Sequence, residues 1–310
     1  MIKAKERSIK AVDVRVPATT ANLGPGFDCL GMALDIWNEV RVVVGAEESA
    51  TEIFGEGADS LSRDDNNLIV RSAAKVFQCA MIPVPRMTLV CRNTIPIGRG
   101  LGSSAAAVVG GLLVGNNLCN QKFSLTQLLE MAIELEGHAD NVAPALLGGC
   151  QITVRDGQEV VTSRVSLPES LTTVLYIPEQ EIPTGQARAI LNKEIPREKV
   201  VFNIGRVALL VNSLCNGRMD DLYVGTQDRV HQPERQVLFT AMNLIMKAAM
   251  SAGAHGAFLS GSGSTVVAFA TGHEMTIGYE MADIADKAGF PGAVRVTKPT
   301  ERGAEVTAVT

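Results

Sequence analysis

The sequence of 310 residues lacks the patterns that define several common classes of protein. Its six cysteines are scattered, none belongs to a C-x-x-C pair, and with only four histidines they give no zinc-ligand spacing. Most of them lie in apolar runs, so we expect buried free thiols in a reducing, cytoplasmic compartment. The 28 Lys and Arg do not outnumber the 33 Asp and Glu, and the net charge of −5 gives no overall basic field for nucleic acid or an anionic membrane.

Long apolar runs are also missing. No uninterrupted run reaches about 18 residues, which predicts no membrane span, and the charged start from Met1 to Arg7 lacks the apolar core of a signal peptide. The length suits two domains of roughly 150 residues, and 46% hydrophobic residues suffice for a sizeable core. Alternating strand and helix patterns predict an α+β fold, with a boundary near Pro168 that gives domains 1–167 and 168–310.

The most informative stretch runs from Pro96 to Ala106 and reads P-I-G-R-G-L-G-S-S-A-A. Glycine tolerates positive φ and carries no Cβ, so backbone N–H groups can converge here on a small volume. An apolar run follows and predicts a helix, with Ser103 or Ser104 as its N-cap. A helix start with unpaired N–H groups suits a phosphate, and the two hydroxyls suit a magnesium ion. The structural alternative is an ordinary glycine-rich turn before a buried helix.

Two common phosphate-binding motifs do not describe this stretch. The Walker A loop requires G-x-x-x-x-G-K-[ST], and no Gly-Lys pair occurs in the chain. The dinucleotide fingerprint G-x-G-x-x-G has a different glycine spacing, and the strand predicted before the stretch, Met87 to Cys91, is not near the N-terminus where that fold usually opens.

A second region of interest is the helix that follows Ser124, with Ser124 as N-cap and Gln127 completing a capping box. Projected at 100° per residue, Glu136 falls on the apolar stripe of this helix, whereas Glu130 and Glu134 point away. A carboxylate on a buried face costs free energy unless it is paired or bound to a cation. Glu136 is therefore a candidate functional residue.

Local patterns predict further elements. A strand from Val12 to Val16 should end at Pro17, a second strand covers Trp37 to Val44, and a helix runs from Asn67 to about Met81. Glycine-rich turn residues between the first two strands bring Asn22 and Asp28 close together. In the second half, a continuous helix is predicted from Pro233 to Ala252.

The stretch at Pro96 resembles the phosphate loop of the GHMP kinase superfamily, P-x-x-x-G-L-G-S-S-A, without departure. Five further stretches look like those of the homoserine kinase family and occur in the same order as in that family. They are T-T-A-N-L-G-P-G-F-D-C-L-G (Thr19 to Gly31), E-G-H-A-D-N-V-A-P (Glu136 to Pro144), I-P-T-G-Q-A-R (Ile182 to Arg188), Asp228 to Arg235, and L-S-G-S-G-S (Leu259 to Ser264). The resemblance covers nearly the whole chain. It implies an N-terminal ribosomal-S5-like domain and a C-terminal ferredoxin-like α/β sandwich.

The activity implied by the resemblance is transfer of the ATP γ-phosphate to the side-chain hydroxyl of L-homoserine, on the way to threonine. ATP would lie over Pro96, Ile97, Gly98, Arg99, Gly100, Leu101, Gly102, Ser103, Ser104, Ala105 and Ala106, with Asn67 either lining the adenine pocket or only capping its helix. Homoserine would contact Asn22, Asp28, His138, Asp140, Thr184, Arg188, Arg235 and Gly261. Asp28 suits the ammonium group, and the two arginines grip a carboxylate bidentately.

The chemistry implied at the site involves three residues. Ser104 and Glu136 would bind magnesium, with Glu134 as the alternative carboxylate. Asn141 stands where other branches of the superfamily often carry an aspartate base, and an amide cannot accept a proton at neutral pH. We therefore expect Asn141 to orient the homoserine hydroxyl. His138 either contacts the substrate or stabilises its turn.

Two alternatives to a homoserine kinase remain at this point: a GHMP kinase for another small alcohol, and a catalytically silent member that binds only nucleotide or a partner protein. The complete loop, with Ser103, Ser104 and Glu136 present, argues against the silent member. We expect a homodimer with a small-molecule substrate and no nucleic-acid or membrane partner.

Overall fold

Two β-sheets organise the protein, and the computed structural model describes residues 9–45, 48–157 and 159–310. The larger sheet has seven strands in the order β11-β1-β2-β4-β3, with β5 paired to β2 and β6 paired to β5. Its strands are β1 (Ala11–Ala21), β2 (Leu30–Val44), β3 (Ala50–Gly55), β4 (Met87–Asn93), β5 (Cys150–Asp156), β6 (Glu159–Val165) and β11 (Glu305–Val309). Pairing is antiparallel except between β3 and β4.

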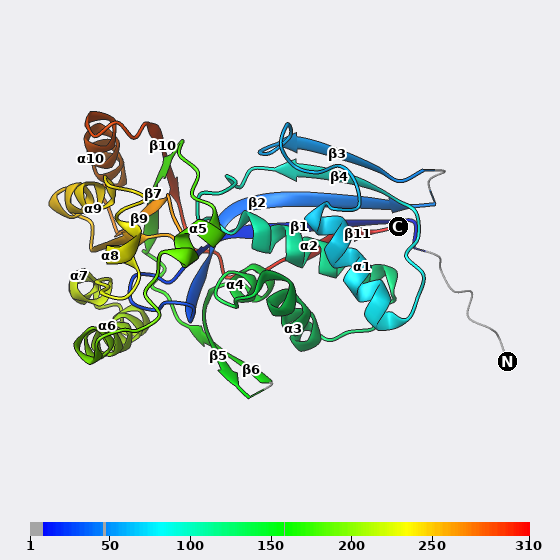
Figure 1. The fold of residues 1–310 in the computed structure, drawn as a ribbon, viewed down its shortest axis with the longest axis horizontal. Helices are drawn as coiled ribbons and strands as arrows, with labels where there is room; N and C mark the ends of the chain where they lie inside the picture. The colour runs from blue at the N-terminus through cyan, green and yellow to red at the C-terminus, as the bar shows by residue number, and fades with distance from the viewer. Residues whose placement is uncertain (1–8, 46–47, 158) are drawn as a thin grey trace.

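Four helices pack together beside the larger sheet (Figure 1). They are α1 (Leu68–Ala80), α2 (Ser103–Leu118), α3 (Leu125–Glu136) and α4 (Val142–Leu147). The central one, α2, is rich in Ala, Val and Gly and is buried along most of its length. A Cβ at Gly111 would lie 2.3 Å from the Ile69 carbonyl oxygen, and one at Gly115 2.8 Å from that of Ala73. These glycines therefore let α1 approach α2 closely.

The second sheet has four strands in the order β10-β7-β9-β8. They are β7 (Thr172–Pro178), β8 (Gly256–Leu259), β9 (Val266–Ala270) and β10 (Gly292–Thr297). The helices of this end of the molecule (Figure 1) are α5 (Thr184–Ala189), α6 (Arg197–Asn216), α7 (Leu222–Gly225), α8 (Gln232–Arg235), α9 (Met242–Ser251) and α10 (Glu274–Lys287), with a 3₁₀ turn at Met219–Asp221. The chain then returns to the larger sheet, where Val309 pairs with Val12. The division at residue 168 remains a prediction.

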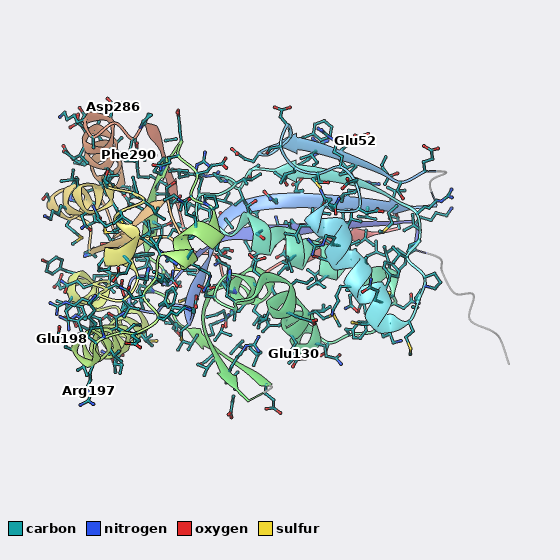
Figure 2. The ribbon with its side chains drawn as sticks, viewed as in Figure 1. Glu52, Glu130, Arg197, Glu198, Asp286 and Phe290 are labelled. Carbon is teal, nitrogen blue, oxygen red and sulfur yellow. The ribbon has the colours of Figure 1, made fainter. Side chains whose placement is uncertain are left out.

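The expectations for α3 are confirmed. The Ser124 hydroxyl accepts from the Gln127 N–H at 3.3 Å, and the Gln127 side chain accepts from the Ser124 N–H at 2.9 Å, which forms the capping box. Glu130 lies on the exposed side of the helix (Figure 2). Glu136 ends the helix with its side chain only 13% exposed, whereas that of Glu134 is 65% exposed. The apolar periodicity therefore predicted the direction of these carboxylates.

The predicted end of the first strand at Pro17 is wrong, because β1 continues to Ala21. Pro17 pairs with Trp37, and the register shifts directly after it. Proline cannot donate a ladder hydrogen bond, so it is tolerated at such an irregularity. The continuous helix from Pro233 to Ala252 is also wrong: α8 ends at Arg235 and α9 begins at Met242. Between them the chain turns so that Phe239 enters the core of the second sheet.

Further differences concern β2, β3, α4, β11 and the start of α2. Strand β2 begins seven positions before the predicted Trp37, and β3, α4 and β11 were not predicted. The N-cap of α2 is Gly102, with φ of +70° and no side-chain hydrogen bond, rather than a serine. Both serines thus belong to the first turn of the helix. Among the described residues, no helix is long and apolar enough to cross a membrane; Met1 to Arg7 lie outside them.

Candidate active site

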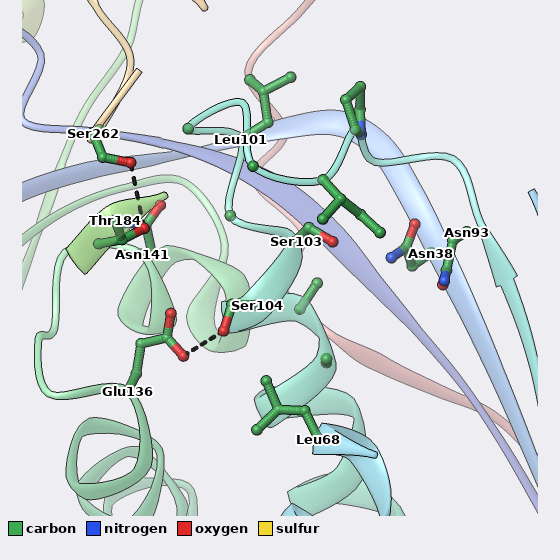
Figure 3. Close-up of a pocket in the computed structure, with 18 of the residues that line it drawn as sticks. Asn38, Leu68, Asn93, Leu101, Ser103, Ser104, Glu136, Asn141, Thr184 and Ser262 are labelled. Carbon is green, nitrogen blue, oxygen red and sulfur yellow. Dashed lines mark hydrogen bonds between the residues drawn. The ribbon is translucent and has the colours of Figure 1, made fainter. Parts of the chain in front are cut away.

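A cleft between the two sheets gathers most of the residues predicted to be functional. Its lining comes from the larger sheet, from the starts of α1 and α2, from the turn after α3, and from α5, α8 and the β8–β9 loop. The side of the cleft near β2 and β4 is mainly apolar, and the opposite side carries the charged residues. Figure 3 shows Asn38 and Asn93 at one side and Ser104 with Glu136 at another.

The phosphate-loop candidate forms the middle of the cleft. Gly98, Gly100 and Gly102 have φ values of +66°, +72° and +70°, which is the left-handed region that glycine enters without steric cost. The second half of the chain holds this loop in place. The Ser260 hydroxyl donates to the Gly100 carbonyl at 2.6 Å, and the Ile182 N–H donates to the Gly98 carbonyl at 3.0 Å. With its carbonyls tied back in this way, the loop and the first turn of α2 form one wall of the cleft.

Two residues of the loop do not line the cleft. The Arg99 guanidinium donates to the carbonyls of Ile97 and Pro178, both at 2.7 Å, and pairs with Glu181 at 3.0 Å. It therefore fastens the loop to the end of β7 and does not reach the cleft. Ala105 is fully buried in the core. The other nine residues between Pro96 and Ala106 line the cleft.

The two candidate metal ligands are in contact. The Ser104 hydroxyl donates to a Glu136 carboxylate oxygen at 2.8 Å (Figure 3). Glu134 instead pairs with Lys75 at 2.8 Å and lies outside the lining. No group of three or more His, Cys, Asp or Glu side chains is placed to hold a metal within the described part of the chain. A hydroxyl and one carboxylate suit magnesium, which usually takes one or two protein carboxylates together with substrate phosphates and waters.

The turn between β1 and β2 presents Asp28 to the cleft. Asp28 has φ of +55°, and its N–H donates to the Asn22 side-chain oxygen at 3.0 Å. The Asn22 amide nitrogen donates in turn to the Gly261 carbonyl at 3.1 Å, which ties the turn to the β8–β9 loop. Arg188 on α5 forms a bidentate pair with Asp28, at 2.8 and 3.1 Å. These bonds raise the pKa of Arg188.

Arg235 lies deeper than Arg188, with 2% of its surface exposed. It donates to the carbonyls of Ala187 at 3.3 Å and Gly261 at 2.8 Å. Burial, and then the neighbouring positive charge of Arg188, lower its pKa to about 10. Sequence reasoning missed the partner that holds it, His231, whose ring Nδ1 lies 3.0 Å from the guanidinium.

His231 is fully buried, and burial lowers its pKa. Its Nε2 lies 2.8 Å from the Gly24 carbonyl, so Nε2 carries the proton and Nδ1 accepts from Arg235. Its ring stacks on Phe27 with centroids 5.2 Å apart. The only signal in the sequence was its place four residues before Arg235.

The turn after α3 places His138, Asp140 and Asn141 in the cleft. His138 Nδ1 lies 2.8 Å from an Asp140 carboxylate oxygen. Burial alone would lower the pKa of His138, but this hydrogen bond and the charges of Asp140 and Glu136 raise it. Thr184 also lines the cleft, with its hydroxyl 3.4 Å from that of Ser262 (Figure 3). Ser262 lines the cleft too; it belongs to the segment L-S-G-S-G-S but was not predicted to be a site residue.

The apolar side of the cleft comprises mostly residues that the sequence did not single out. Val40, Ile53, Leu61, Leu68, Ile69 and Cys91 line it, with the amides of Asn38 and Asn93. Asn67 lines the cleft and also caps α1 by accepting from the Ile69 N–H at 3.0 Å, and its contact with adenine stays a prediction. A polar residue inside an apolar strand, as Asn38 is in β2, was the available signal.

Comparison with known proteins first defines the class of protein to which the chain belongs. The family model described as "GHMP kinases N terminal domain" matches residues 67–149, and that described as "GHMP kinases C terminal" matches residues 210–276. The fold also matches mevalonate diphosphate decarboxylase from Staphylococcus aureus with a TM-score of 0.69 at 12% identity, which shows the fold alone. The two-sheet α+β architecture is therefore that of the GHMP kinases, as predicted.

The relatives define the family. The chain is 41% identical to the homoserine kinase of Carboxydothermus hydrogenoformans, with 94% of this chain and 96% of that one covered, and 42% identical to that of Moorella thermoacetica, with 94% and 99% covered. The structure of homoserine kinase from Cytophaga hutchinsonii matches with a TM-score of 0.85 at 30% identity over 99% of both chains. The chain belongs to the homoserine kinase family, and it is a kinase of the ATP-dependent GHMP class.

The glycine loop provides a test of the cleft. In Gly100→Ala the new Cβ would lie 2.1 Å from the Ser260 carbonyl oxygen, at a φ that disfavours alanine. We expect ATP affinity, measured by calorimetry, to fall at least tenfold, or about 1.4 kcal/mol. Gly205→Ala on the exposed side of α6 meets open space and is the matched control, with unchanged affinity. Wild-type affinity in Gly100→Ala would contradict this role of the loop.

Proposed function

We propose that the protein transfers the γ-phosphoryl group of ATP to the side-chain hydroxyl of L-homoserine, giving O-phospho-L-homoserine and ADP. One observation carries this proposal: the glycine loop and the charged residues Asp28, Arg188 and Arg235 face the same cleft. The first feature suits a nucleotide triphosphate and the second a zwitterionic amino acid. Family membership supports the same substrate.

The nucleotide would lie along the loop and the apolar side of the cleft. Backbone N–H groups at the start of α2 and the partial positive charge of the helix end stabilise phosphate. The aliphatic side chains of Val40, Ile53 and Ile69 provide an apolar surface for adenine, and Asn38 or Asn67 provides polar groups at its edge. Arg99 supports this site indirectly, by holding the loop against β7.

Magnesium is the second expected component, and Ser104 and Glu136 would hold it with phosphate oxygens of the nucleotide. When bound, the ion neutralises charge on the β- and γ-phosphates. Glu136 would exchange its hydrogen bond from Ser104 for the metal. The hydrogen bond from the Ser104 hydroxyl, at 2.8 Å, holds Glu136, the last residue of α3 before the Gly137 cap, beside the first turn of α2.

The amino-acid site is occupied by the protein's own charges in this structure. Arg188 and Asp28 satisfy each other, and both side chains are more than one third exposed to the cleft. Homoserine would take the place of this pair, with its ammonium group on Asp28 and its carboxylate on Arg188 and Arg235. A ligand that carries only one of the two charges would leave either Asp28 or Arg188 without a partner, so both charges are required.

The transfer step needs orientation more than proton removal. A bond forms between the homoserine side-chain oxygen and the γ-phosphorus, and the bond from that phosphorus to the β–γ bridging oxygen breaks. The Asn141 amide orients the attacking hydroxyl, and the hydroxyl proton leaves to a phosphoryl oxygen or to water. Phosphoryl transfer proceeds under these conditions because positioning and charge neutralisation supply most of the rate.

The function is tested by measuring ADP formation with a panel of alcohols and identifying the product by ³¹P NMR. We expect turnover with L-homoserine, and much lower kcat/KM with 4-hydroxybutyrate, which lacks the ammonium group, or 3-aminopropan-1-ol, which lacks the carboxylate. Turnover with mevalonate but not homoserine would indicate a different GHMP kinase, and ATP binding without turnover of any alcohol would indicate a silent member.

We further propose a cytoplasmic location, supported by six free cysteines among the described residues. We also propose that the protein is a homodimer, which light scattering tests.

The metal ligand is tested by a matched pair of glutamates on α3. Glu136→Gln should lower turnover strongly at limiting magnesium, by about tenfold or more, with partial recovery at high magnesium, because one anionic ligand is lost. Glu134→Gln should have little effect, since Glu134 is exposed and paired only with Lys75. The measurement is turnover against magnesium concentration at saturating ATP and homoserine. The reverse order of effects would assign the metal to Glu134.

The carboxylate site is tested with Arg188→Ala. The loss of a guanidinium that pairs with a substrate charge should lower kcat/KM for homoserine by the equivalent of ~2–5 kcal/mol, with ATP affinity almost unchanged. Arg164→Ala is the control, because Arg164 forms an exposed ion pair with Glu301 outside the cleft. An unaltered kcat/KM for homoserine in Arg188→Ala would refute the assignment.

A further inference from the structure

Thr19 on β1 connects the two functional parts of the cleft although it does not line the cleft itself. Its backbone N–H donates to the carbonyl of Leu101 in the phosphate loop at 3.1 Å. Its hydroxyl donates to the side-chain oxygen of Asn141 at 2.8 Å, across 122 positions of sequence. Thr19 is fully buried, so this hydrogen bond is shielded from water.

Gly102 provides the space for this hydroxyl. A Cβ at Gly102 would lie 2.0 Å from the Thr19 Oγ1 and 3.3 Å from the Asn141 Oδ1. The glycine that caps α2 therefore also leaves room for the contact between Thr19 and Asn141. Because the two side chains are in direct contact, a displacement of one side chain also displaces the other.

The chemistry of the neighbours determines which way the Asn141 amide faces. Its nitrogen lies 3.4 Å from a carboxylate oxygen of Asp140, and a carboxylate can only accept a hydrogen bond. In the reversed orientation, the amide oxygen would face this acceptor. The Thr19 hydroxyl, on the other side, supplies a donor to the amide oxygen. Asp140 therefore selects this orientation, and in it the Thr19 hydroxyl, which can donate or accept, donates to the amide oxygen.

We propose that Thr19 is a positioning residue for phosphoryl transfer, which holds Asn141 with its amide nitrogen available to the attacking hydroxyl. This inference rests on the proposed function. The amide oxygen is used by Thr19, and one N–H is directed to Asp140, which leaves the second N–H for a ligand in the cleft. An N–H donor placed on the hydroxyl oxygen fixes the direction of its remaining lone pair towards the γ-phosphorus.

On this proposal, the contact also fixes the distance between the homoserine hydroxyl and the nucleotide. The phosphate loop is hydrogen-bonded to the backbone of Thr19. The Asn141 amide, which would orient the homoserine hydroxyl, is hydrogen-bonded to the side chain of Thr19. A misplacement of about 1 Å between reacting groups costs up to two orders of magnitude in rate. The hydroxyl of Thr19 should therefore affect kcat more than the binding of either substrate.

The test compares Thr19→Val with Thr19→Ser in the full-length protein. Valine has nearly the shape of threonine and keeps the backbone N–H but lacks the hydroxyl, whereas serine keeps the hydroxyl. We expect Thr19→Val to lower kcat for homoserine 10- to 100-fold, with KM for ATP changed less than twofold, and Thr19→Ser to stay within about threefold of the wild type. If Thr19→Val does not fold, Thr19→Ala makes the same comparison.

Two further readouts separate positioning from a merely structural role. The ratio of ADP formed to phosphohomoserine formed should rise in Thr19→Val, because a misdirected hydroxyl lets water compete for the phosphoryl group. In an Asn141→Ala background, Thr19→Val should cause little additional loss, because the two residues act as a unit.

The inference is overturned if Thr19→Val and Thr19→Ser have equal kcat, if the losses add in the double variant, or if only KM for ATP changes. Absence of homoserine phosphorylation by the wild-type protein would instead refute the proposed function, so the two failures are distinguishable.

Discussion

The structure depends on how the carbonyl groups of the glycine loop are held. A loop that presents its N–H groups to an anion must place its carbonyl oxygens elsewhere, and these need donors when water is excluded. The donors come from remote segments: Ser260 for Gly100, Ile182 for Gly98 and Thr19 for Leu101. The loop wall of the cleft is thus held jointly by segments associated with both sheets, and the first turn of α2 completes it.

The same remote segments hold the amino-acid side of the cleft. The Gly261 carbonyl, next to Ser260, accepts from both Asn22 and Arg235. A single loop between β8 and β9 therefore supports the glycine loop and the charged side of the cleft together. This arrangement explains why charged groups that must be desolvated, such as Arg235, retain fixed partners: an unpaired buried guanidinium would cost several kcal/mol.

The pairing of Asp28 with Arg188 shows how a cleft that is proposed to bind a zwitterion neutralises its own charges without a ligand. Opposite charges that face one cavity attract each other, and without a ligand they form the bidentate pair seen here. The proposed substrate carries the same two charges in a fixed relation, so it would exchange for the pair with no net loss of ion pairing. Selectivity for an amino acid then follows from the cost of leaving one partner alone.

Much of this could be predicted because the relevant signals are local. The apolar period of α3 directed Glu136 inwards, the capping box fixed where that helix begins, and the alternate glycines predicted the loop. The failures at β3 and β11 were non-local. Strand β3 lies at the edge of the sheet and β11 pairs with β1 from the far end of the chain, so neither is defined by its own pattern. Arg99 was predicted to contact the nucleotide because it lies within the glycine loop, but its guanidinium turns away from the cleft to Ile97, Pro178 and Glu181.

The sequence by itself determined the candidate groups: a glycine loop suited to phosphate, charged side chains suited to an amino acid, and an amide at Asn141, where the resemblance leads one to expect an aspartate. Only the tertiary structure decided how those groups are oriented. The partners of Arg99, Arg235 and Asn141 are the carbonyl of Pro178, the ring of His231 and the hydroxyl of Thr19. Except for His231, each lies far away in the chain, and hydrogen-bond direction depends on spatial neighbours, which a local pattern does not contain.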